Sequence, residues 1–157
     1  MIGFKGLLAG IVVVAACSIA ATPPAFAQDA ASLCAGRGTV DVAAPIPTSL
    51  MEQAAKLFGG DDTDSFAATV YRCVNGEVWL CTYGANLVCD HANVAKANPG
   101  ATQWCKENPG ARSVPMAATG HDTIYSYVCA GKTARISRTI AKVDERGFIA
   151  GNWKRLK

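Results

Sequence analysis

The sequence is poor in the residues and motifs on which common enzyme classes depend. Its 157 residues include only two histidines, His91 and His121. No serine lies in a G-x-S-x-G motif, which argues against the nucleophile elbow of α/β-hydrolases. Gly131-Lys132-Thr133 imitates the end of a phosphate-binding loop, but Ser126 stands where that loop needs its first glycine. Hydrolases of that fold and phosphate-loop enzymes are therefore not expected.

Metal-binding motifs are missing as well. Cys73, Cys81 and Cys89 are spaced eight residues apart, far wider than the C-x₂₋₄-C spacing of zinc sites. The segment Asp61-Asp62-Thr63-Asp64 carries three carboxylates, but it lacks the pattern and the distant glutamate of a calcium loop. We interpret it as a solvated acidic loop, and we expect no metal and no other cofactor.

Charge is scarce too, because charged residues make up only 17% of the chain while hydrophobic residues make up 50%. A disordered chain has the opposite balance, so this composition excludes intrinsic disorder. The length favours a single folded domain, which we expect to span residues 28–157.

The first 27 residues have the pattern of an export signal. Lys5 precedes an apolar run over residues 7–16, and Ala25-Phe26-Ala27 fits a cleavage site. The run is too short and too rich in small residues for a membrane span. We therefore expect cleavage after Ala27 and a periplasmic or secreted protein. A lipobox-like sequence ending at Cys17 offers the alternative of a lipid-anchored protein.

Six cysteines remain in the mature chain, and an even number in a small exported protein predicts a disulfide framework. They are Cys34, Cys73, Cys81, Cys89, Cys105 and Cys129. Six cysteines allow roughly 15 pairings. The turn sequence Asn75-Gly76 predicts a β-hairpin over residues 67–83. In a two-residue hairpin Cys73 lies opposite Val78, so Cys73 and Cys81 point to opposite faces and cannot bridge.

Local patterns predict an α+β fold with a small antiparallel sheet from two β-hairpins and two or three short helices. The second hairpin is expected over residues 123–140, where β-branched and aromatic residues precede a Gly-Lys turn. A short edge strand is expected over residues 114–117.

Three helices are predicted from capping residues. Ser49 begins a capping box, and Gly59-Gly60 ends the helix that follows. Asp90 is a candidate cap for a helix over residues 91–97. Asn98-Pro99 is typical of the start of another helix, which ends before residue 108.

Basic residues accumulate towards the C-terminus. Residues 129–157 contain eight basic and two acidic residues, whereas residues 28–128 contain six basic and ten acidic ones. Arg135 and Arg138 are three residues apart, so we expect only part of this charge to share one strand face. Charge of this kind protects an edge strand from aggregation. Alternatively, Arg135, Arg138 and Lys142 form a binding patch for an anionic envelope polymer or an acidic exported protein.

His121 and Asp122 form the best candidate for catalysis, because a carboxylate beside an imidazole orients it for proton transfer. A loop histidine that bonds locally is the simpler interpretation. We include both residues among the candidate ligand-binding residues and predict no catalytic residue.

Several short motifs resemble a family of small exported bacterial proteins with six cysteines. The similarity covers most of residues 34–157 and rests on the following segments: Tyr71-Arg72-Cys73, Gly84-Ala85-Asn86-Leu87, Trp104-Cys105, Gly120-His121-Asp122-Thr123-Ile124-Tyr125, and Gly147-Phe148-Ile149-Ala150 with Trp153. The resemblance implies export and disulfide bonding but no activity. A fainter likeness to small periplasmic lysozyme inhibitors suggests a lysozyme-like protein as a possible partner.

The sequence thus predicts a non-catalytic exported binding module, with an anionic envelope polymer or an exported protein as its partner. We expect no nucleic acid partner and no transmembrane span. The alternatives are a small envelope enzyme that uses His121 and a purely structural envelope protein.

Overall fold

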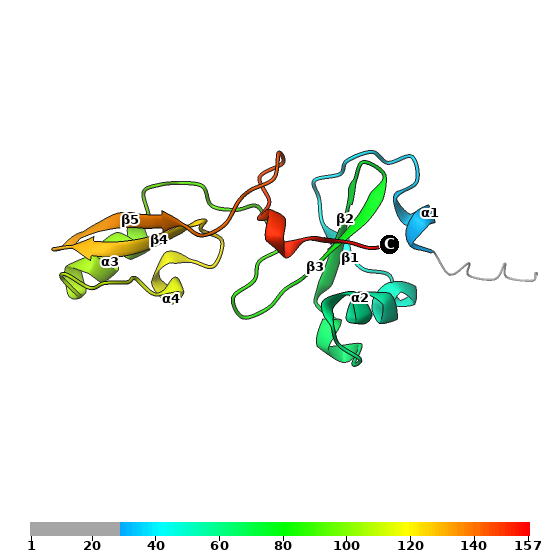
Figure 1. The fold of residues 1–157 in the computed structure, drawn as a ribbon, viewed down its shortest axis with the longest axis horizontal. Coiled ribbons are helices and arrows are strands. Elements are labelled where there is room, and N and C mark those ends of the chain that lie inside the picture. The colour runs from blue at the N-terminus through cyan, green and yellow to red at the C-terminus, as the bar shows by residue number, and fades with distance from the viewer. Residues whose placement is uncertain (1–28) are drawn as a thin grey trace, which may run out of the picture.

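The computed structural model describes residues 29–157; the expected signal sequence and Cys17 lie outside the described residues. The chain forms two lobes at opposite ends of an elongated molecule (Figure 1). The first lobe comprises residues 29–92 and 143–157, and the second lobe comprises residues 93–142. Two chain segments connect them, because the chain leaves the first lobe, builds the second and returns.

The first lobe contains an antiparallel sheet with the strand order β1-β2-β3-β6. Its strands are β1 (Ala44–Pro45), β2 (Thr69–Val74), β3 (Glu77–Thr82) and β6 (Lys154–Arg155). The helices of this lobe are α1 (Ala30–Cys34), α2 (Met51–Phe58) and the 3₁₀ turns η1 (Thr48–Leu50), η2 (Asp64–Phe66) and η3 (Ala150–Asn152). Helix α2 ends where Gly59 adopts a left-handed φ of 84°, as the glycine pair predicts.

The hairpin of β2 and β3 has the predicted register. Asn75 and Gly76 form its turn with φ angles of 53° and 80°, which a two-residue turn of this type requires. Cys73 lies opposite Val78, and Cys81 points to the other face of the sheet. The prediction that Cys73 and Cys81 do not pair is therefore confirmed.

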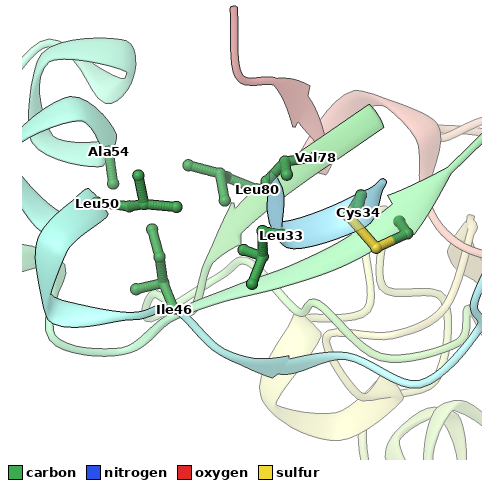
Figure 2. Close-up of a cluster of buried hydrophobic side chains, with 8 residues drawn as sticks. Leu33, Cys34, Ile46, Leu50, Ala54, Val78 and Leu80 are labelled. Carbon is green, nitrogen blue, oxygen red and sulfur yellow. A yellow bond between two sulfur atoms is a disulfide. The ribbon is translucent and has the colours of Figure 1, made fainter. Parts of the chain in front are cut away.

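Both faces of this hairpin are covered. One face packs against α1 and α2. Figure 2 shows how apolar side chains from these helices, from the segment before η1 and from the hairpin meet there. The buried residues of this cluster are Leu33, Cys34, Ile46, Leu50, Ala54, Cys73, Val78 and Leu80. The other face carries Cys81 and packs against Phe148 and Trp153, which the chain supplies after it returns from the second lobe.

The second lobe contains the hairpin of β4 (Tyr125–Ala130) and β5 (Thr133–Thr139), with α3 (Pro99–Glu107) packed on one face. Asn98 caps α3 by accepting a hydrogen bond of 2.8 Å from the backbone N–H of Ala101, as predicted. Helix α4 (Met116–Thr119) lies beside α3. The core of this lobe is small and consists of Ala101, Cys105, Val114, Tyr127 and Cys129.

Three disulfides connect the six cysteines of residues 29–157. Cys34–Cys73 ties α1 to β2 across 39 residues, and Cys81–Cys89 closes a loop of eight residues in the same lobe. Cys105–Cys129 joins α3 to β4 in the second lobe. The predicted disulfide-stabilised α+β fold is therefore confirmed, although the two hairpins belong to separate sheets rather than to one.

Two local predictions are wrong. Residues 91–97 form no helix, because His91 forms a β-bridge with Phe148 and Asn93 forms one with Thr123. These long-range pairings use the backbone groups that a helix would need. The expected edge strand over residues 114–117 is also absent. Within these four residues only Val114 pairs with β4, by donating to the carbonyl of Tyr127, and α4 begins two residues later.

No helix within residues 29–157 is long and apolar enough to cross a bilayer.

Candidate functional site

The two lobes carry opposite charge. Residues 93–142, which form the second lobe, include seven lysines and arginines but only Glu107 and Asp122 as acids. The described residues of the first lobe contain seven basic and ten acidic residues. The basic C-terminal segment seen in the sequence is therefore divided by the fold, because Arg146 and all later cations belong to the acidic lobe.

Ion pairs neutralise cations in the first lobe only. Four of its basic residues bind carboxylates, in the pairs Lys56–Glu52, Arg72–Asp144, Arg146–Asp41 and Arg155–Glu77. Within residues 29–157, none of the seven cationic side chains of the second lobe forms an ion pair. The positive charge of the second lobe is thus not neutralised by ion pairs within residues 29–157.

A β-bulge places Arg135 and Arg138 on the same face of the second hairpin. Arg135 lies opposite Val128, and Arg138 lies opposite Ser126, with an irregular register between Ser126 and Tyr127. The extra residue of the bulge, Ser137, shifts the alternation by one position. The expectation that these two arginines point to different faces is therefore wrong, and their charges are concentrated on one face.

This face is open to solvent. The opposite face of the hairpin carries Tyr127 and Cys129 and is covered by α3, whereas Arg135 and Arg138 alternate with those residues and are exposed. Lys142, just beyond the hairpin, is exposed as well. We call Arg135, Arg138 and Lys142 the basic face, and it includes all the cationic candidates that the sequence suggests.

His121 and Asp122 do not form the dyad that an enzyme would need. Nδ1 of His121 is buried and has no hydrogen-bond partner within residues 29–157. Asp122 contributes its backbone carbonyl, which accepts a hydrogen bond of 2.8 Å from Asn93 N–H. The other histidine, His91, packs against Phe148 with ring centroids 4.2 Å apart and ring planes tilted by 34°. Groups of metal ligands are likewise absent from the part of the chain that the structure describes.

A buried ion pair in the first lobe was not anticipated from the sequence. The side chain of Arg72 is only 3% exposed, and it donates to Asp144, which is 26% exposed. The guanidinium carbon lies 4.0 Å from the ring centroid of Phe148 and 4.5 Å from that of Trp153. The only sequence signal for this site was a charged residue, Arg72, inside a predicted hairpin strand. The alternation of apolar and polar residues along a strand places such a residue on the solvent-exposed face.

The hydrogen bonds of Asp144 make the fold sensitive to acid. Burial favours the neutral carboxyl, but hydrogen bonds from Arg72 and from the backbone N–H groups of Phe148 and Arg146 outweigh burial and lower the pKa of Asp144 below 3.8. A carboxyl whose pKa is lower in the folded state stabilises the fold above its unfolded pKa and loses that contribution as the pH falls through its folded pKa.

We therefore expect the free energy of unfolding to decrease between about pH 5 and pH 2. Asp144→Asn should have a shallower decrease, because it lacks this titrating group. Urea unfolding at a series of pH values measures both slopes, and equal slopes in the two proteins would contradict the role of Asp144.

The chain matches no protein-family model, no curated protein and no solved structure.

Proposed function

We propose that this chain is an exported, non-catalytic protein that binds an anionic polymer of the cell envelope through the basic face of its second lobe. The observation that carries the proposal is the set of unpaired cations in that lobe, two of which the bulge brings to one open face.

The distribution of this charge favours binding over simple protection of a sheet edge. Protection of the sheet edge from aggregation needs charged side chains only along β5, and either positive or negative charge prevents edge-to-edge pairing. Here the cations extend to α3 at Lys106 and to the loop at Arg112, and nearly all charges of the lobe have one sign. A field of one sign over several elements attracts polyanions and raises their rate of association.

Arginine also suits the proposed ligand. Its guanidinium group presents a planar fork of donors that matches carboxylate and phosphate groups. A polymer that repeats such groups would contact Arg135 and Arg138 at the same time, because the two side chains share a face. Simultaneous contacts add to affinity without a deep pocket.

Export is supported by the three disulfides, since bonds of this kind persist in oxidising compartments and are rare in the cytosol. The export pattern of the first 27 residues and the resemblance to small exported six-cysteine proteins agree with this part of the proposal. The periplasm or the cell exterior is therefore the proposed location.

Co-sedimentation with isolated, anionic cell-wall material tests the proposal. We expect the mature chain to bind at low ionic strength and to be released as salt rises, because salt screens exposed charges. Arg135→Gln/Arg138→Gln should weaken binding about thirtyfold, since each of the two cations near an anionic surface contributes about 1 kcal/mol.

The matched control is Arg37→Gln/Lys157→Gln, which removes the same charge from exposed positions in the first lobe. It should bind almost as the wild type does. Equal losses in the two double variants would show that net charge alone acts, and binding that resists high salt would contradict an electrostatic face. A wild-type chain that does not bind at all would favour the purely structural alternative.

A further inference from the structure

Four buried N–H donor atoms without acceptors lie on the face of the first-lobe hairpin that carries Cys81 and packs against Phe148 and Trp153. They are Nε and Nη1 of Arg72 and the Nε1 atoms of Trp79 and Trp153, and none has a hydrogen-bond partner within residues 29–157. Arg72 and Trp79 are direct cross-strand partners in β2 and β3. A buried donor without an acceptor is costly, so such a concentration is unusual in a folded protein.

Ring stacking does not satisfy these donors. The rings of Phe148 and Trp153 attract the charge of Arg72 through their faces. The N–H bonds of a guanidinium, however, lie in its own plane, and they need acceptors in that plane. The aromatic neighbours therefore hold Arg72 in place and leave two of its three nitrogen atoms unpaired.

Asp144 does not pair with these donors. Its Oδ2 already accepts from Nη2 of Arg72, and its Oδ1 accepts from the backbone N–H groups of Arg146 and Phe148, at 2.9 Å and 3.0 Å. The rings of Phe148 and Trp153, which lie against Arg72, offer apolar faces and an indole N–H but no acceptor in the plane of the guanidinium. Water or a bound molecule is left to supply the acceptors.

A cavity lies beside these donors. It has a volume of about 160 Å³ and is lined by Arg72, Val74, Trp79, Asp144, Ala150 and Trp153. A larger cavity of about 390 Å³ shares Arg72, Val74 and Asp144 with it. For comparison, an apolar protein cavity of about 150 Å³ accommodates benzene.

We propose that this cavity binds a small monocarboxylate with a single flat apolar ring or a body of similar size. The carboxylate would accept from Arg72 and from an indole N–H, and the apolar body would lie against Trp79 and Trp153. An anion is favoured over a neutral molecule because Nε and Nη1 of the buried cation are unpaired, and hydrogen bonds from a guanidinium to a carboxylate are stronger than those to a neutral acceptor. This site lies in the first lobe and does not depend on the basic face.

Titration of the disulfide-bonded chain with benzoate tests the proposal by NMR of the indole N–H groups. The chain contains three tryptophans, and Trp104 in the second lobe also has a buried, unpaired Nε1, so it serves as an internal control. We expect saturable shifts of the Trp79 and Trp153 signals with a dissociation constant on the order of 1 mM or tighter, and none for Trp104. Benzamide, the neutral analogue, should bind at least tenfold more weakly.

Two variants separate the donors from the fold. Arg72→Met removes the cation and should abolish the shifts. Trp79→Phe keeps an aromatic ring in the cavity wall but loses one donor, so it should weaken benzoate binding several-fold. Binding to Trp79→Phe is measured from the shift of the Trp153 indole N–H signal. Signals that do not move would mean that water satisfies these donors, and the proposal would fall. Equal binding of benzamide, or an equal shift of Trp104, would also overturn it.

Discussion

Cys105→Ala/Cys129→Ala is expected to unfold the second lobe while the first lobe stays folded. This disulfide closes a loop of 24 residues, and restricting the unfolded chain to that extent stabilises the fold by about 3 kcal/mol. Its two cysteines also belong to the five buried side chains that form the core of the lobe. A core of that size has little else to replace the lost stability.

Hydrogen exchange measures this effect by region. Amides of β4 and β5 should lose protection in the variant, and amides of β2 and β3 should keep it. Binding to anionic cell-wall material should weaken as well, because Arg135 and Arg138 share a face only in the folded hairpin.

The matched control is Cys81→Ala/Cys89→Ala, which opens a loop of eight residues in the first lobe and should cost about 2 kcal/mol there. Protection of β4 and β5 should not change in that control. Uniform loss of protection over both lobes in either variant would show that the molecule unfolds as one unit and would contradict the expected independence.

Asp144→Asn is expected to destabilise the first lobe by about 3 kcal/mol, the lower end of the range for breaking a buried ion pair, because Asp144 is partly exposed. The amide oxygen of Asn is able to accept from the backbone N–H groups of Arg146 and Phe148. The amide nitrogen would then face Nη2 of Arg72, donor against donor. The variant leaves a buried cation unpaired with almost no change in shape.

Denaturant unfolding of the disulfide-bonded proteins measures this loss, and a second substitution tests its cause. Arg72→Met/Asp144→Asn should recover more than half of the lost stability, because removing the buried cation removes the uncompensated charge. A double variant as unstable as Asp144→Asn alone would show that the loss arises from packing or from the loop around Asp144. A single variant within about 0.5 kcal/mol of the wild type would show that the pair contributes little.

The parts of the fold that are determined locally could be predicted from the sequence. Asn75-Gly76 requires positive φ angles, and this requirement sets the register of β2 and β3 and separates Cys73 from Cys81. Asn98 and Pro99 likewise begin α3 through contacts within one turn of helix. In each case the physical cause lies within a few residues of its effect.

The candidate sites depend on long-range contacts, and these were not predictable. The bulge at Ser137 follows from the pairing of whole strands, so simple alternation puts Arg135 and Arg138 on different faces. Arg72 is buried because Phe148 and Trp153 return over the sheet from the far end of the chain. The segment after Asp90 has a helical pattern, yet tertiary bridges to Phe148 and Thr123 determine its conformation.

The chain leaves the first lobe after Ala92 and returns to it at Val143, and near this junction Ala92 N–H donates to the carbonyl of Gly147 at 2.8 Å. Residues 93–142 are an excursion from the first lobe, and β6 completes the four-stranded sheet after it. Insertions, deletions or replacement within the excursion would leave the strand order of that sheet intact. Natural selection can therefore remodel the second lobe without rebuilding the four-stranded sheet of the first.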